Sequence, residues 1–347
     1  MKPIEYIQKC IELAEQGRGF VNPNPLVGSV VVHDNVIIGE GWHKAYGLAH
    51  AERMAIDSVE NKELLRESTL YVTLEPCSHF GKTPPCTHYI VEHRIPNVVV
   101  SMYDPNPLVS GKGIAFLEEN GVNVSVGLGR ETSAYQNRFF LTHHTLQRPY
   151  IQLKWAESAD GFIAPLPKQK KSISGESAYK YTHSLRQSVS AVLVGVGTWQ
   201  IDQPQLTDRL FGGPQPLRIV LDPENSGNYN RAITDTNLTL VINQYQNGVT
   251  GNCEWVQVSD CSNSLDELMR VLYDRNINSL LVEGGANTLN RFINEKLFDE
   301  MTIYKSKKVH FNRGVLAPEV NVDSWQSMDW DEDVCCNYSN WILPSHI

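Results

Sequence analysis

The spacing at which apolar residues recur changes several times in the first half of the chain. Apolar residues recur at helical spacing from Pro3 to Gln16 and glycines follow, which predicts a helix over 3–16. The next apolar run alternates around Asp34-Asn35, which predicts a β-hairpin with strands over 28–33 and 36–41. Further strands are predicted over 69–74, 97–102 and 122–127, and further helices over 49–59, 113–120 and 131–144. This alternation is typical of a three-layer α/β/α domain.

The same kind of pattern starts again after Arg148-Pro149. Strands are predicted over 150–156, 191–194, 218–221, 238–242, 279–282 and 301–305, and helices over 177–186 and 265–275 and from Asn287 to Ile293. A chain of 347 residues is long for one hydrophobic core. We therefore predict two α/β domains, residues 1–146 and 147–347.

Composition and charge exclude several classes of protein. The net charge is −9 and the one basic cluster is Lys168–Lys171, which disfavours a nucleic-acid-binding surface. No apolar run is long enough to span a membrane, and the acidic, amphipathic N-terminus is unlike a secretory or transit peptide. The seven cysteines are irregularly spaced, so we expect reduced thiols in a cytoplasmic protein.

Two short segments contain residues that suit one zinc ion. His50, Cys77 and Cys86 are three good zinc ligands, and three protein ligands leave one tetrahedral position for catalysis. Glu52 lies two residues after the histidine and can carry protons between an activated water and a leaving amine. Zinc-dependent nucleobase deaminases have this constellation, although their cysteines are separated by two residues and here by eight. A structural zinc site completed by His79 or His88, or two unrelated buried thiols, are the alternatives.

The predicted elements bring these residues to the ends of helices and strands. His50 and Glu52 fall in the first turn of the helix over 49–59, and Cys77 follows the strand over 69–74. We expect Thr83 to cap a helix that contains Cys86 in its first turn. A helix N-terminus favours a neutral histidine and a thiolate, the forms that bind metal.

Glycine turns follow two strands of the second half. Gly195 and Gly197 follow one strand, and the segment 283–287 follows another. Such turns let backbone N–H groups approach a phosphate at a helix N-terminus, but they are as often needed only for tight packing. The pattern alone leaves both interpretations open.

Several segments together resemble one family. The stretches NPNPLVG (22–28), GWH (41–43), His50-Ala51-Glu52 and PCSHFGKTPPC (76–86) are similar to the deaminase half of the bifunctional deaminase–reductases of riboflavin biosynthesis. GVGTWQIDQPQLTDR (195–209) and VEGGANTLNRF (282–292) are similar to the reductase half. The resemblance implies a cytidine-deaminase-like N-terminal domain, a C-terminal domain with the fold of dihydrofolate reductase, one zinc ion per chain and NADPH.

The resemblance also implies site residues. Contacts to NADPH fall on Ala156, Ser172, Thr198, Asp202, Gly285, Ala286, Asn287, Thr288, Leu289, Asn290 and Arg291. Contacts to the substrate fall on Asn24, His43, His79, Lys82 and Thr83 in the first half and on Lys170, Arg186, Leu206, Arg209 and Glu283 in the second. The arginines suit a ribose phosphate, because guanidinium groups match phosphate oxygens.

The reductase half departs from the family in three places. Ser172 stands where the family often has an aromatic residue, within the divergent loop Pro165–Ser174, and Asp202-Gln203 replaces a double acid. The stretch KSKKVHFNRGV (305–315) replaces a more apolar strand end. The lysines of the divergent loop are either solvated or in contact with phosphate. We therefore leave open whether this loop weakens the reductase.

The resemblance implies a bifunctional enzyme that deaminates a phosphorylated diaminopyrimidine and then reduces its ribose to a ribityl chain. One alternative is a zinc deaminase of another base, with a weak or inactive reductase domain. Another is a zinc-stabilised module that only senses a nucleotide, in which Glu52 has no function. The sequence leaves the oligomeric state, a homo-oligomer included, and the proton donor of the reductase open.

Overall fold

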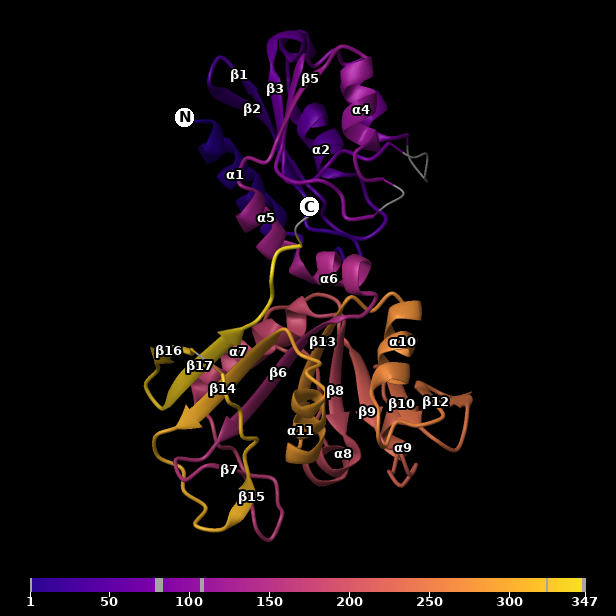
Figure 1. Cartoon of the computed structure of the whole chain (residues 1–347), viewed down its shortest axis with the longest axis vertical. Helices are drawn as coiled ribbons and strands as arrows, with labels where there is room; N and C mark the ends of the chain where they lie inside the picture. The colour runs from indigo at the N-terminus through magenta and orange to yellow at the C-terminus, as the bar shows by residue number, and fades with distance from the viewer. Residues whose placement is uncertain (1, 79–83, 107–108, 323, 345–347) are drawn as a thin grey trace. The chain divides into compact units, whose positions relative to one another are not determined.

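The chain folds into two compact units in the computed structural model, which describes residues 2–78, 84–106, 109–322 and 324–344 (Figure 1). The first unit runs to Leu146, and the second is Gln147–Trp341. Residues 342–344 group with the first unit, whereas the sequence prediction placed them in the second. A guanidinium N–H of Arg130 donates a hydrogen bond to the carbonyl of Pro344 at 3.3 Å.

The first unit is built on one five-stranded sheet with strand order β2-β1-β3-β4-β5. β1 pairs antiparallel with β2 and β3, and β3, β4 and β5 run parallel. The elements are α1 (Pro3–Glu15), β1 (Gly28–His33), β2 (Val36–Trp42), α2 (Ala51–Ser58), η1 (Lys62–Glu67), β3 (Thr69–Val72), α3 (Cys86–Glu92), β4 (Asn97–Val100), α4 (Lys112–Glu119), β5 (Asn123–Val126), α5 (Arg130–Gln136) and α6 (Arg138–Leu146).

Both faces of this sheet are covered, as a three-layer fold requires. Val31 of β1 packs into a core with residues of α2, α3 and α4, such as Ile56 and Leu117. Its neighbours Val30 and Val32 point to the opposite face and pack against α1. Figure 1 shows α1 and α5 on one side of the sheet and α2 and α4 on the other. Successive side chains of a strand point to opposite faces, and both faces are covered here. The apolar run of β1 is therefore continuous.

The prediction of one helix over 131–144 was wrong, because the chain forms α5 and α6 with a break at Asn137. The buried Asn137 side chain accepts a hydrogen bond from the Leu26 N–H at 2.8 Å and donates one to the Leu26 carbonyl at 2.9 Å. A tertiary contact therefore fixes this position, and helical periodicity does not reveal it.

Replacing Asn137 by alanine should lower the free energy of unfolding of the first unit by about 2–4 kcal/mol, because it leaves both buried backbone groups of Leu26 without a partner. Chemical denaturation measures this loss. Asn123→Ala, at an exposed position, is the control and should cost less than about 0.5 kcal/mol. An equal, small effect for both variants would contradict the role given to Asn137.

The second unit is built on a ten-stranded sheet with strand order β11-β12-β10-β9-β8-β13-β6-β14-β17-β16 and a small sheet of β7 and β15. The strands from β12 to β14 in this order are parallel. The elements are β6 (Tyr150–Glu157), β7 (Phe162–Pro165), α7 (Glu176–Ser188), β8 (Ala191–Gly195), α8 (Val196–Asp202), β9 (Leu217–Leu221), α9 (Asn230–Thr234), β10 (Thr239–Asn243), β11 (Gly248–Thr250), β12 (Cys253–Gln257), α10 (Asp266–Asp274), β13 (Ser279–Gly284), α11 (Ala286–Asn294), β14 (Glu300–Ser306), β15 (Gly314–Leu316), β16 (Gln326–Asp329) and β17 (Asp333–Ser339).

The main core of this unit lies between the sheet and the helices α10 and α11. Leu272 and Phe292 pack there against Leu193 and Leu280 of the central strands. Ala178 of α7 packs with Tyr304 of β14 in a separate cluster. Among the described residues, no helix is long and apolar enough to cross a membrane.

The strands missed by the sequence prediction lie mainly at the edges of the sheets. β17 pairs antiparallel with β14, and β16 with β17. β16 is exposed along its length and β17 mixes buried cysteines with polar residues, so neither shows an apolar run or clean alternation. β17 depends on its pairing with β14, which is remote in sequence, and β16 in turn pairs with β17.

Candidate functional site

Three elements of the first unit bring His50, Cys77 and Cys86 together. His50 is the N-cap of α2, Cys77 follows β3, and Cys86 is the first residue of α3. Nδ1 of His50 lies 3.5 Å from Sγ of Cys77 and 3.3 Å from Sγ of Cys86. Zn–S and Zn–N bonds at a tetrahedral angle place nitrogen and sulfur about 3.5 Å apart. The donor set and its spacing therefore fit a zinc ion.

The helix that carries Cys86 begins later than predicted. Its N-cap is Pro85, in an extended conformation, so the prediction of Thr83 as the cap was wrong. A proline disfavours helical geometry in the residue before it, which keeps Pro84 out of the helix. Cys86 still lies at a helix N-terminus, and its N–H donates to Sγ of Cys77 at 3.3 Å.

The two thiols and the imidazole perturb one another. A hydrogen bond from Cys86 lowers the pKa of Cys77 to about 4, and the same contact together with burial raises the pKa of Cys86. The hydrogen bond with Cys77 raises the pKa of His50 to about 9. A divalent cation displaces the protons held by this cluster, because metal ligands bind in their deprotonated forms.

Glu52 lies in the first turn of α2 and is buried. Burial raises the pKa of its carboxyl group to about 7, and the carboxyl group interacts with the Cys86 thiol. A carboxyl group with a pKa near neutrality can both accept and donate a proton. Glu52 therefore lies beside the cluster, where the sequence places a proton carrier, and that role stays a prediction.

His43 and Asn24 lie next to the cluster. The His43 ring is buried and meets the His50 ring edge to face, with centroids 5.6 Å apart. Its Nδ1 lies 3.2 Å from the Ala49 carbonyl, so this nitrogen carries the proton, and Nε2 accepts from Nδ2 of Asn24 at 3.1 Å. Burial lowers the pKa of His43, which keeps the ring neutral.

The other predicted contacts of this site are His79, Lys82 and Thr83, and they lie outside the described residues. His88 stacks on Phe116 at 4.4 Å between ring centroids. In the described part of the chain, the one group of three possible ligands is His50, Cys77 and Cys86. His88 therefore does not complete a four-ligand structural site.

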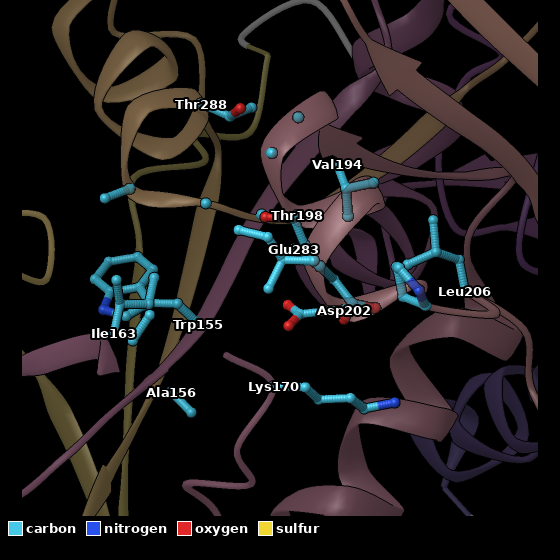
Figure 2. Close-up of a pocket in the computed structure, with 18 of the residues that line it drawn as sticks. Trp155, Ala156, Ile163, Lys170, Val194, Thr198, Asp202, Leu206, Glu283 and Thr288 are labelled. Carbon is cyan, nitrogen blue, oxygen red and sulfur yellow. The ribbon is translucent and has the colours of Figure 1, made fainter. Parts of the chain in front are cut away.

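The second unit contains a cavity of about 940 Å³ (Figure 2). Figure 2 shows Trp155, Ala156 and Ile163 on one side and Thr198, Asp202 and Leu206 on the other. Most predicted contacts of this half line it, namely Ala156, Lys170, Ser172, Arg186, Thr198, Asp202, Leu206, Arg209, Glu283, Gly285, Ala286, Asn287, Thr288 and Arg291. Leu289 and Asn290 do not line it, and Leu289 is fully buried in the main core.

The two glycine turns meet at this cavity. A Cβ on Gly195 would lie 2.3 Å from Oγ1 of Thr288, and one on Gly285 would lie 3.0 Å from Oγ1 of Thr198. Gly285 also has a φ of 70°, which disfavours other residues, and it precedes α11. The bare turns therefore bring the N-terminus of α11 to the cavity, where backbone N–H groups suit the phosphates of NADPH.

A buried charge network forms part of the cavity wall. Nε and Nη2 of Arg186 both donate hydrogen bonds to the Glu283 carboxylate, and the bond from Nη2 to Oε2 is 2.8 Å long. Nζ of Lys154 lies 3.7 Å from the same Oε2. The two cations lower the pKa of Glu283 to about 2 against its burial, and burial lowers the pKa of Lys154. Sequence reasoning missed Lys154, although a lysine within the apolar strand β6 is a signal, since a buried charge needs a partner.

The two predicted phosphate contacts differ in their surroundings. Arg186 forms an ion pair with Glu283, and its Nη1 donates to the Thr207 carbonyl at 3.3 Å. Arg209 is more exposed and has only neutral partners in the described residues, Gln205, Tyr179 and His183. Arg209 is therefore the better placed of the two to meet a phosphate.

Comparison with known proteins identifies the family of each half of the chain. The model of the cytidine and deoxycytidylate deaminase zinc-binding region matches residues 1–102, and that of the RibD C-terminal domain matches residues 149–309. The riboflavin biosynthesis protein RibD of Aquifex aeolicus is 40% identical over 310 residues, 88% of this chain and 86% of that protein. The RibD protein of Bacillus amyloliquefaciens is 38% identical over 334 residues, 93% and 89% of the two chains.

A solved structure extends the similarity to the whole fold. The diaminohydroxyphosphoribosylaminopyrimidine deaminase/5-amino-6-(5-phosphoribosylamino)uracil reductase of Thermotoga maritima is 38% identical, with a TM-score of 0.86 over 96% of this chain and 97% of that one. The predicted fold classes, zinc as a cofactor and the NADPH-dependent reductase are thereby confirmed at the level of the family. The chain belongs to the RibD family, the bifunctional deaminase–reductases of riboflavin biosynthesis.

Proposed function

We propose that the first unit deaminates 2,5-diamino-6-(5-phosphoribosylamino)pyrimidin-4(3H)-one and that the second reduces the ribosyl chain of the product to a ribityl chain. The observation that carries the proposal is the convergence of His50, Cys77 and Cys86 beside the buried Glu52. The substrates named for the similar Thermotoga protein support it.

His50, Cys77 and Cys86 would hold the zinc ion. When bound, zinc is a Lewis acid that brings the pKa of a water molecule near neutrality. Glu52, buried beside these ligands, would take the proton of that water and pass it to the departing ammonia. Asn24 and the neutral His43 would orient the pyrimidine, and Lys82, His79 and Thr83, outside the described residues, stay predicted substrate contacts.

The cavity of the second unit would hold NADPH and the deaminated product together. NADPH supplies the hydride when bound. The turn before α11 would hold its phosphates, and the predicted contacts that line the cavity would hold the rest. Leu289 could contribute only through its backbone, because its side chain is buried in the core. We assign the supply of the proton to the pair of Lys154 and Glu283. Lys154 holds this proton, because the pKa of Glu283 is low. Arg209 and Lys170 bind the product's phosphate, Leu206 contacts the product, and Arg186 holds Glu283 in place.

We also propose that the partner is this phosphorylated pyrimidine and not a nucleic acid, which the net charge of −9 supports. A cytoplasmic location is supported by the seven cysteines, all of which are free thiols. A homo-oligomer remains a prediction that size measurement in solution tests.

Metal removal separates the two activities and tests the proposal. Chelation should abolish ammonia release from the diaminopyrimidine, while NADPH oxidation with the deaminated product persists, because the zinc ligands lie in the first unit. Both rates are followed before chelation, after it, and after zinc is restored. Ammonia release that survives full removal of zinc would rule out the proposed deaminase site. A failure to oxidise NADPH even before chelation would rule out the reductase.

A further inference from the structure

Glu75, between β3 and Cys77, holds a buried carboxylate that sequence reasoning did not single out. Its side chain accepts four backbone hydrogen bonds. Oε2 accepts from Asp104 at 3.2 Å and Gly111 at 3.0 Å, and Oε1 accepts from Gly113 at 2.8 Å and Ile114 at 3.4 Å. The residue is only 4% exposed.

This carboxylate replaces the missing cap of α4. Gly111, the N-cap of that helix, has no side chain, and two of the bonds come from the first turn. No lysine or arginine forms an ion pair with Glu75 in the parts of the chain that the structure describes. Backbone N–H groups and the helix dipole therefore balance its charge, which ties Glu75 to Asp104 and to the start of α4.

The bonds of Glu75 fix the backbone that leads to Cys77. The Glu75 N–H donates to the Met102 carbonyl at 3.0 Å. A Cβ on Gly113 would lie 2.2 Å from the Pro76 carbonyl, so the start of α4 packs directly on the residue between Glu75 and Cys77. The Cys77 carbonyl is held from the other side by the N–H and Oγ1 of Thr87, each at 3.2 Å.

We propose that Glu75 is a positioning residue of the deaminase, which sets the Cys77 thiolate at the distance from His50 and Cys86 that zinc requires. The inference rests on the proposed zinc ligands. It assigns to Glu75 an effect on metal affinity beyond its effect on the stability of the unit. A residue that merely stabilised the unit would lower zinc affinity no more than an equally destabilising core substitution.

The test compares Glu75→Gln with Leu117→Ala in the full chain. The amide introduced by Glu75→Gln would turn an NH₂ group toward two of the four N–H donors, so the segment before Cys77 must shift. Leu117 is the control, because it belongs to the same helix α4 but its buried side chain packs in the core. Zinc dissociation constants are measured by competition with a chelator, and the absorption bands of bound Co²⁺ report the ligand geometry. Glu75→Gln should weaken zinc binding about 10–100-fold and shift the Co²⁺ bands. Leu117→Ala should lower the unfolding midpoint and leave both readouts near the wild type.

The outcomes separate the inference from the proposed function. Zinc affinity of Glu75→Gln within about threefold of wild type, or no weaker than that of Leu117→Ala, would overturn the inference. If Glu75→Gln does not fold, Glu75→Asp takes its place, since the shorter carboxylate cannot reach all four N–H groups, and the same comparison decides. Cys77→Ser is the reference for the ligands themselves. If it binds zinc as tightly as wild type, the proposed zinc site fails, and the inference fails with it.

Discussion

Ammonia release by the Glu52→Gln variant is expected to fall by about 10²–10⁴-fold, while one zinc ion per chain remains bound. Glu52 is not among the residues that fit the metal, so its substitution leaves the three ligands in place. The amide is close in size to the carboxyl group but cannot take a proton from water at neutral pH. The buried site offers no bulk water to replace it, because Glu52 is only 3% exposed.

Three measurements on the same protein check this expectation. Metal analysis gives the zinc content, an ammonia assay gives the first rate, and NADPH oxidation with the deaminated product gives the second, which should stay unchanged. Glu40→Gln is the matched control, because Glu40 lies exposed in β2, where it pairs with Lys9. Ammonia release within about threefold of wild type would show that another group carries the proton. A loss of zinc would instead mean that Glu52 supports the metal site.

Most of the fold follows from local patterns, and the exceptions share one cause. The β1–β2 hairpin, the helices α1 and α4 and the parallel strands have apolar periods that the sequence displays directly. The break at Asn137 depends on its hydrogen bonds with Leu26, and the strand β17 depends on its pairing with β14. Periodicity counts apolar residues within one element, so it does not register partners that lie elsewhere in the chain.

The candidate sites follow the same division. His50, Cys77, Cys86 and Glu52 could be recognised because their residue types carry the chemistry, whatever the fold between them. Lys154 and Glu75 could not be singled out, because the partners of each come near only in the fold, Glu283 in one case and the start of α4 in the other. Arg186 lines the cavity as expected, and its contact with the substrate stays a prediction, but its pairing with Glu283 could not be foreseen.

That pairing gives the second large expected effect, in the stability of the second unit. Glu283→Gln should lower its free energy of unfolding by about 3–5 kcal/mol at neutral pH, because Arg186 and Lys154 stay buried without their carboxylate. The wild type should also lose stability in acid. The pKa of Glu283 is about 2 in the fold against 4.5 in the unfolded chain, so its contribution is complete above pH 4.5 and is lost as the pH falls toward 2. Glu283→Gln should lack this part of the pH dependence.

Tryptophan fluorescence during denaturation measures this stability, because six of the seven tryptophans lie in the second unit. The control is Glu254→Gln, which breaks an exposed pair with Arg275 in the same unit and should cost less than about 1 kcal/mol. Lys154→Met separates stability from catalysis. NADPH oxidation should collapse in this variant, because the proposed proton donor is lost. The loss of stability should be smaller than in Glu283→Gln, because the Arg186–Glu283 pair remains. Equal stability and equal acid sensitivity of Glu283→Gln and wild type would contradict the network, since a buried carboxylate between two cations cannot be neutralised without cost.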